Sequence, residues 1–143
     1  MPPSLEISLI TSRVKSLNFG IKPDPPPKGK IQVHFALSHN YNYDYKSKTI
    51  AVLLSAAVDD KHMPFFLKVE YEGIFTLSKR LPKKDVEPIA QMNCPAILFP
   101  FLRETVAEVT RRGGFSPLML PVINFVQSAK EHKAKAISQS EDS

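Results

Sequence analysis

The sequence has 143 residues, of which 43% are hydrophobic and 23% charged, and its formal net charge is +5. This length suits one domain that buries roughly 68–70% of its unfolded surface, and the composition is typical of a soluble protein. No apolar run approaches the ~20 residues of a membrane-spanning helix, and the N-terminus has no signal-peptide pattern, so we expect a cytoplasmic protein without membrane insertion. The basic residues are scattered in small groups, which favours surface charge for solubility over nucleic-acid binding. The single cysteine excludes an intramolecular disulfide.

The first part of the chain alternates between apolar and polar residues, as β-strands do. Residues 5–21 predict a long strand, and a change of phase near the middle predicts a bulge there. The proline-rich residues 22–30 predict a stiff extended connection. A second strand is expected from Ile31 to Leu37, and the tyrosines at 41, 43 and 45 continue its alternation into a strand end and turn.

Two further strands follow the same pattern. The third is expected from Ile50 to Val58, and the fourth starts at Phe65 after a hairpin turn over residues 59–62. Gly73 predicts a bulge near the end of the fourth strand, because an isolated glycine in a strand pattern often marks one.

The second part of the chain changes to a helical period. Apolar residues recur every three or four positions between Pro95 and Val109, and Gly113-Gly114 predicts the helix end. Pro100 lies inside this pattern and is expected to kink the helix or delay its start. A short helical turn is expected over residues 86–92, and a second, surface helix from Val122 to about residue 135. The prediction is an α+β domain, residues 1–136, in which a four-stranded antiparallel sheet is followed by two helices packed on one side, with a disordered tail at 137–143.

Residues for chemistry are sparse, so the sequence predicts no metal site, no cofactor and no enzyme. Cys94 precedes a proline and is expected to be a small buried hydrophobe, although a nucleophile paired with His34 or His62 stays open as an alternative. Arg103 and Glu104 predict an ion pair in preference to a catalytic pair. The four histidines do not have metal-ligand spacing: His34, His39, His62 and His132.

Several short motifs occur in a characteristic order in the second half of the chain. They are Gly73-Ile74-Phe75, Cys94-Pro95 followed by residues 97–100 and Arg103-Glu104, Arg112-Gly113 with Phe115, and residues 121–125. In this order and spacing the sequence resembles the SecB family of bacterial protein-export chaperones. The resemblance implies a homotetramer, a dimer of dimers, that binds unfolded polypeptides without ATP and keeps them unfolded for export.

The resemblance also implies peptide-binding grooves lined by aromatic and aliphatic residues of the fourth strand and the helical region. For each matching residue, packing in the protein core is the alternative. The residues at or beside the matching motifs are Phe65, Ile74, Leu98, Phe99, Phe101 and Phe125.

The chain departs from the family's pattern where export members present carboxylates to the translocation motor SecA. The matching positions hold Ser16, Gly20 and Lys68, so the loss of negative charge weakens the expectation of a SecA contact. Two alternatives therefore stay open. One is a dedicated chaperone of a single partner, such as an antitoxin of a toxin–antitoxin system. The other is a non-catalytic adaptor subunit whose apolar residues are covered by a fixed partner or by its own core.

Overall fold

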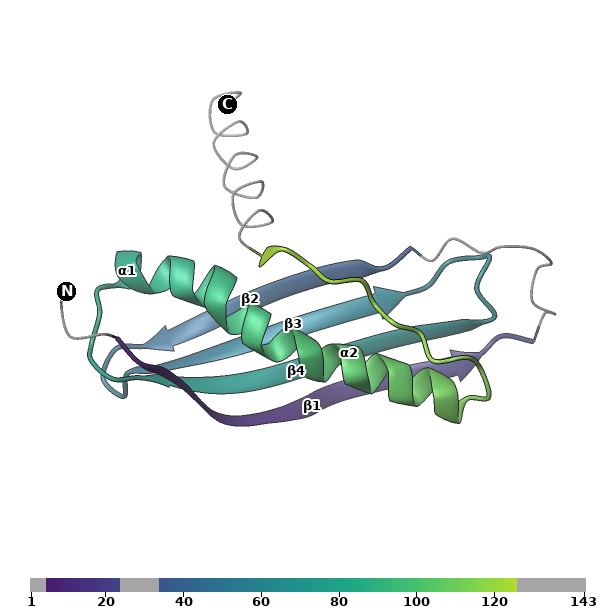
Figure 1. Ribbon diagram of the computed structural model, residues 1–143, viewed down its shortest axis with the longest axis horizontal. Coiled ribbons are helices and arrows are strands. Elements are labelled where there is room, and N and C mark those ends of the chain that lie inside the picture. Colours follow the sequence, from purple (N-terminus) through teal and green to yellow (C-terminus); the bar gives the residue numbers. More distant parts are fainter. Residues whose placement is uncertain (1–4, 24–33, 126–143) are drawn as a thin grey trace, which may run out of the picture.

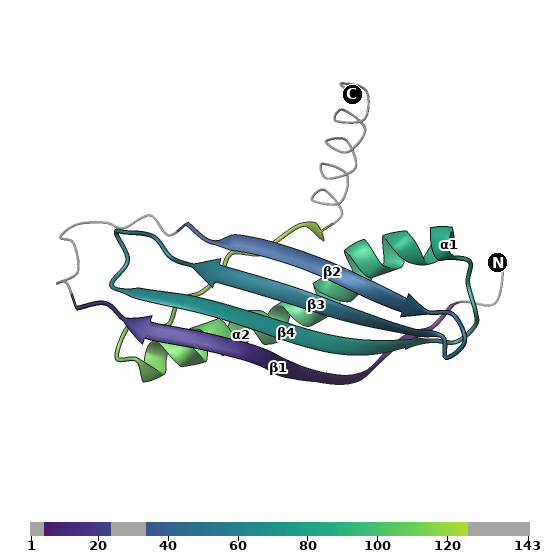
Figure 2. The ribbon, with the colours of Figure 1, turned by 180° about the vertical axis from the view of Figure 1, so that it is seen from behind.

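A computed structural model describes residues 5–23 and 34–125 as one antiparallel sheet with a helical layer on one face (Figure 1). The sheet order is β1-β4-β3-β2. The opposite face of the sheet carries no described helix (Figure 2). This arrangement confirms the predicted α+β class and the four-stranded sheet. The strands are β1 (Ile7–Ile21), β2 (Ala36–Asp44), β3 (Thr49–Val58) and β4 (Phe65–Leu77).

The two central strands, β3 and β4, form the sheet side of the core. Every second residue of β3 from Ile50 to Val58 is buried, as its alternation predicts. The antiparallel register between β3 and β4 runs without interruption from the Thr49–Thr76 pair to the Val58–Leu67 pair. One face of this pair of strands therefore packs under the helical layer, while the other face stays open.

The edge strands follow the prediction over most of their described length. The bulge expected in β1 is confirmed, because its register with β4 shifts between Leu9 and Thr11 and again between Val14 and Ser16. The strand end and turn expected over the tyrosines at 41, 43 and 45 are confirmed, because β2 stays paired with β3 as far as Asp44 and a turn follows at residues 45–48. The predicted start of β2 at Ile31 lies outside the described residues.

Gly73 does not form the expected bulge. A Cβ atom there would lie 2.5 Å from Cδ2 of Leu98, a residue of the helix above. The glycine therefore lets the helix approach the sheet closely. Because β4 stays regular through this point, Ile74 faces the open side of the sheet, opposite to the helices.

The helical layer is a single continuous segment that starts earlier than predicted. It consists of α1 (Lys83–Pro88), a π-helical turn η1 (Ile89–Asn93) and α2 (Cys94–Arg112). The wide turn closes with a hydrogen bond from the Cys94 N–H to the Ile89 carbonyl, next to Pro95, which has no N–H to donate. The helix continues through Pro100, so the delayed start expected from that proline is wrong. The second helix predicted from Val122 lies almost wholly outside the described residues. The tail at 137–143 lies entirely outside them.

Candidate functional site: a cavity between the helix and a return segment

After α2 the chain reverses and runs back beside the helix, as Figure 1 shows. We call residues 113–125 the return segment. The reversal uses Gly114, whose φ of 90° lies in the left-handed region that favours glycine. A hydrogen bond from the Phe115 N–H to the Thr110 carbonyl closes the turn.

Two side chains of α2 hold the return segment in place. The Arg103 Nε donates a hydrogen bond of 2.7 Å to the Leu120 carbonyl. The buried Thr110 hydroxyl donates to the Val106 carbonyl and accepts a 2.9 Å hydrogen bond from the Leu118 N–H. Because these contacts satisfy part-buried backbone groups, the return segment has a defined position on the helix.

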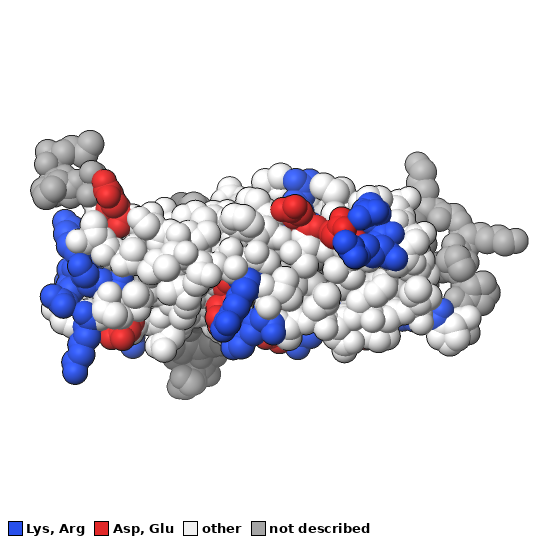
Figure 3. All heavy atoms as spheres, turned by 90° about the horizontal axis from the view of Figure 1, so that it is seen from below, with Lys and Arg blue, Asp and Glu red and all other residues white. Residues whose placement is uncertain are grey.

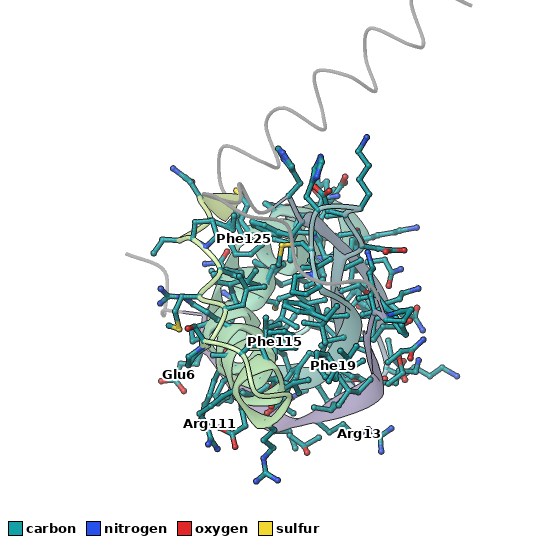
Figure 4. All side chains as sticks on the ribbon, turned by 90° about the vertical axis from the view of Figure 1, so that its right-hand side faces the viewer. Glu6, Arg13, Phe19, Arg111, Phe115 and Phe125 are labelled. Carbon is teal, nitrogen blue, oxygen red and sulfur yellow. The ribbon has the colours of Figure 1, made fainter. Side chains whose placement is uncertain are left out.

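Aromatic contacts fix the return segment at both of its ends. At one end Phe115 packs on Phe65 with ring centroids 5.0 Å apart, and Phe65 also contacts Phe19 at 5.7 Å. At the other end Phe125 meets the edge of Phe99 at 5.7 Å and that of His39 at 6.4 Å. Figure 4 shows Phe19 and Phe115 close to each other and Phe125 apart from them.

A cavity of about 570 Å³ lies between the return segment and the start of α2. Its volume falls in the range of known ligand pockets. Val122 on its wall is 84% exposed, so the cavity is accessible from solvent, and Phe125 forms its inner side. The lining residues are Met92, Asn93, Ala96, Val122, Ile123, Asn124 and Phe125.

The structure separates the six predicted peptide-binding residues into three places. Phe125 lines the cavity, and Phe99 packs against Phe125 from behind. Phe125 is 5% exposed and Phe99 is 6% exposed. Leu98 and Phe65 are buried, Leu98 beneath the helix at Gly73 and Phe65 in the aromatic cluster with Phe115. The remaining two lie away from the cavity: Phe101 on the flank of α2 that faces β1, and Ile74 on the open sheet face.

Sequence reasoning missed most of the cavity wall. Met92 and Asn93 were expected before the main helix, and Val122 inside a second helix. Their contribution depends on the continuous helix and on the reversal at Gly114, neither of which a local pattern reveals. The available signal was the motifs themselves, since Met92 and Asn93 directly precede Cys94-Pro95 and Val122 lies within the motif at residues 121–125.

A second apolar surface, the edge strip, follows the opposite flank of α2. Phe101 is 39% exposed and stacks on Tyr71 at 6.1 Å with the rings nearly parallel. Tyr71 is the cross-strand partner of Val14 in the edge strand β1, so the two side chains share a face. Seen from the β1 side, a broad surface without charged side chains lies between charged groups (Figure 3). The edge strip consists of Val14, Leu17, Tyr71, Ile97 and Phe101.

The open sheet face holds the three positions that we compared with the family's SecA-contact residues. Ser16 pairs with Glu70 and Gly20 with Phe66, while Lys68 is exposed on the neighbouring strand. The carboxylates on this face have cationic neighbours: Glu70 has Lys68 at 3.8 Å, and Glu72 has Arg13 at 3.1 Å and Lys15 at 3.8 Å. The face is therefore close to electrically balanced.

The burial of Cys94 favours a structural role for this residue over a nucleophilic one. Cys94 is fully buried, as predicted, and this burial raises the pKa of its thiol to about 12, so the reactive thiolate is scarce at neutral pH. No group of three or more potential metal ligands occurs within residues 5–23 and 34–125. None of the helices in these ranges is long and apolar enough to span a membrane.

Comparison with known proteins identifies the family. The family model described as preprotein translocase subunit SecB matches residues 13–136. The protein-export protein SecB of Afipia carboxidovorans is 37% identical over 94 residues, which are 66% of this chain and 57% of that protein. The SecB protein of Paramagnetospirillum magneticum is 38% identical over 86 residues, 60% of this chain and 54% of that protein. The matched part of the chain thus spans little more than half the length of these curated relatives.

A solved structure supports the fold. A SecB-like chaperone of Mycobacterium tuberculosis, in complex with a peptide from an antitoxin, superposes with a TM-score of 0.66 at 16% identity. The superposition covers 82% of this chain and 90% of the mycobacterial one. Sequence motifs, fold and family model agree, and the chain belongs to the SecB family.

Proposed function

We propose that the chain is an ATP-independent holdase that binds unfolded polypeptides or preproteins and keeps them unfolded for export. The observation that carries this proposal is the solvent-accessible cavity between α2 and the return segment, which Phe125, Ile123 and Val122 line. Relatives named protein-export proteins support the export role. The peptide bound to the mycobacterial neighbour supports a peptide as the ligand. The role needs no cofactor and no catalytic residue, and it belongs in the cytoplasm, before translocation.

Energetics explain why one such cavity is not enough. Burying one large apolar side chain contributes roughly 1.5–3 kcal/mol, whereas ordering each residue of the bound peptide costs about 1–2 kcal/mol for its backbone. A short segment that buries two or three side chains is therefore close to break-even. Several linked cavities hold one polypeptide much more tightly, because the second contact is intramolecular.

A homotetramer, a dimer of dimers, supplies these linked cavities. The edge strip is suited to the contact between subunits, since it is apolar, contiguous and flanked by the unpaired edge of β1. In this arrangement Phe101 lies in the contact between subunits, whereas Phe125 and Phe99 form the peptide site. Phe65 and Leu98 then act from beneath, by fixing the return segment and the helix.

A dedicated chaperone of a single partner, such as an antitoxin, is the second candidate. The balanced open face favours it, because Ser16, Gly20 and Lys68 add no carboxylate and the two glutamates there have cationic neighbours. Such a face offers little of the negative charge that the family's export members present to SecA. Recovery of one co-purifying protein would favour the dedicated role, whereas a broad set of bound polypeptides, or measurable SecA affinity, would favour general export.

The decisive test is suppression of aggregation of a chemically denatured protein by the purified chain. We expect suppression by the wild type and its loss in Val122→Asp, which places a charge on the exposed wall of the cavity. Met119→Asp is the matched control, because Met119 lies in the same return segment, is 56% exposed, and does not line the cavity. Equal suppression by both variants would contradict the proposed site, and no suppression by the wild type would contradict the holdase role.

A further inference from the structure

One end of the molecule gathers lysine and arginine side chains that have no ion-pair partner among the described residues. These residues come from the turn between β2 and β3 and from the segment that joins β4 to α1. Elsewhere, Arg13, Lys68, Arg111 and Arg112 lie within salt-bridge distance of glutamates. We call this group the cationic end, and it consists of Lys46, Lys48, Lys79, Arg80, Lys83 and Lys84.

Hydrogen bonds to backbone carbonyls hold the two parts of the cationic end together. The Arg80 guanidinium donates a 3.0 Å hydrogen bond to the Lys46 carbonyl, and the Leu77 N–H donates a 2.9 Å hydrogen bond to the Lys48 carbonyl. The Tyr43 hydroxyl donates to the Leu81 carbonyl at 2.8 Å. Positive side chains consequently predominate at the left end of Figure 3, where α1 begins in Figure 1.

A second cavity, of about 400 Å³, opens at this end. Tyr41, Tyr43 and Tyr45 line it together with Asn42 and Lys83. It therefore combines aromatic surface with an exposed ammonium group, while Tyr45 itself is 58% exposed. This composition suits a short polypeptide segment with both a carboxylate and apolar groups.

The two cavities lie along the same side of the edge strand β2. His39, which contacts Phe125, and the tyrosines at 41 and 43 alternate with exposed residues, so all three face the helical layer. At about 3.3 Å per residue, the four steps from His39 to Tyr43 span roughly 13 Å. An extended polypeptide held at Phe125 therefore reaches the cationic end within about five residues.

We infer that the cationic end binds acidic segments of the polypeptides that the Phe125 cavity holds by their apolar segments. This inference rests on the proposed function and names its ligand class: unfolded chains with an acidic segment about five residues from an apolar one. A peptide fits better than a nucleic acid, because Asp44, Asp85 and Glu87 lie on the same elements. These carboxylates repel a continuous phosphate backbone, whereas a peptide presents its charges at separate points.

The test uses fluorescent peptides that share one apolar segment and differ only in an acidic or a lysine-rich flank. Fluorescence anisotropy gives their dissociation constants with the full chain. We expect the acidic peptide to bind about three- to ten-fold more tightly at ~0.1 M salt, since each exposed charge pair contributes little. This difference should shrink at ~1 M salt, where the Debye length falls to about 3 Å.

A matched pair of variants locates the effect. Lys83→Glu changes a residue that lines the second cavity, whereas Lys61→Glu makes the same charge change in the exposed turn between β3 and β4, at the other end of the strands. Circular dichroism checks the fold of both. We expect the preference for the acidic peptide to vanish in Lys83→Glu and to persist in Lys61→Glu. An equal decrease in both variants would indicate net charge alone and overturn the inference.

The remaining outcomes separate the two proposals. If both peptides bind the wild type equally, the inference is wrong and the proposed holdase stands. If neither peptide binds, the proposed function fails and the inference fails with it. If a single-stranded oligonucleotide displaces the acidic peptide at equal concentration, the site is a general polyanion site and the assignment to acidic polypeptides is overturned.

Discussion

Single residues decide how closely the helical layer approaches the sheet, and Gly73 is the clearest case. Its position in β4 is regular, so the glycine is required by contact with Leu98 and not by backbone conformation. The sequence pattern showed only that an unusual residue interrupts a strand. It did not show whether a bulge or a close neighbour is the cause, because the neighbour lies 25 positions away in the chain.

Replacement of this glycine tests the contact. Gly73→Ala should reduce the free energy of unfolding by about 1–3 kcal/mol, since a methyl group would meet a fully buried leucine. Urea unfolding followed by circular dichroism measures the change. The double variant Gly73→Ala/Leu98→Ala provides the control, because removal of the leucine side chain opens space for the new methyl group. Its destabilisation should be clearly smaller than the sum of the two single changes, and strict additivity would show that the two groups do not interact.

At the scale of elements, the helical segment shows why prediction succeeded in the sheet and only partly in the helices. The alternation in β3 is a strong signal, because successive side chains of a strand point to opposite faces and only one face is fully buried. The helix instead has a fully buried residue at every fourth position from Val86 to Thr110, and two of these, Ala90 and Cys94, are small. Small buried residues give a weak apolar signal, so the start at Lys83 was missed. The complete stripe is Val86, Ala90, Cys94, Leu98, Leu102, Val106 and Thr110.

The π-helical turn follows from the same stripe. A step of four residues turns an α-helix by about 400°, so such a stripe drifts by roughly 40° at each step. The wider turn at residues 89–93 reduces this drift, and it lies where Pro95 removes an N–H donor. Neither the drift nor the wider turn can be read from a local pattern, because the sheet underneath sets the direction in which the buried stripe must point. The cavity depends on the same geometry, since Met92 and Asn93 of this turn form part of its wall.

Attachment of the return segment to α2 gives a prediction for this scale. Thr110→Val should leave the part-buried Leu118 N–H without its acceptor, at a cost of about 1 kcal/mol. Amide hydrogen exchange at Leu118 should accelerate by the factor that corresponds to this free-energy cost. Thr105→Val is the matched control, because the Thr105 hydroxyl donates only to the Phe101 carbonyl within its own helix. If exchange at Leu118 responded equally to both variants, the side chain of Thr110 would not be what holds the return segment.

At the scale of the whole molecule, the proposed function divides the apolar surface between two uses. In that proposal the cavity at Phe125 takes polypeptides, and the edge strip joins subunits. The sequence placed Phe101 and Phe125 in one group, since both belong to motifs of the same family. Only the fold shows that they lie on opposite flanks of α2, because a residue's flank depends on the direction in which the helix crosses the sheet.

Phe101 separates these two uses experimentally. Phe101→Asp places a charge in the middle of the edge strip, where burial against a second subunit would leave it unpaired and poorly solvated. Light scattering should therefore show a lower mass than for the wild type, falling toward the 16.0 kDa of one chain. Met119→Asp should keep the wild-type mass, since Met119 lies in the return segment and outside the edge strip. The isolated cavity of a dissociated Phe101→Asp chain should still bind a short peptide, but weakly, because the linked sites of the assembly are lost. A wild-type mass for Phe101→Asp combined with loss of peptide binding would instead place Phe101 in the peptide site and leave the subunit contact elsewhere.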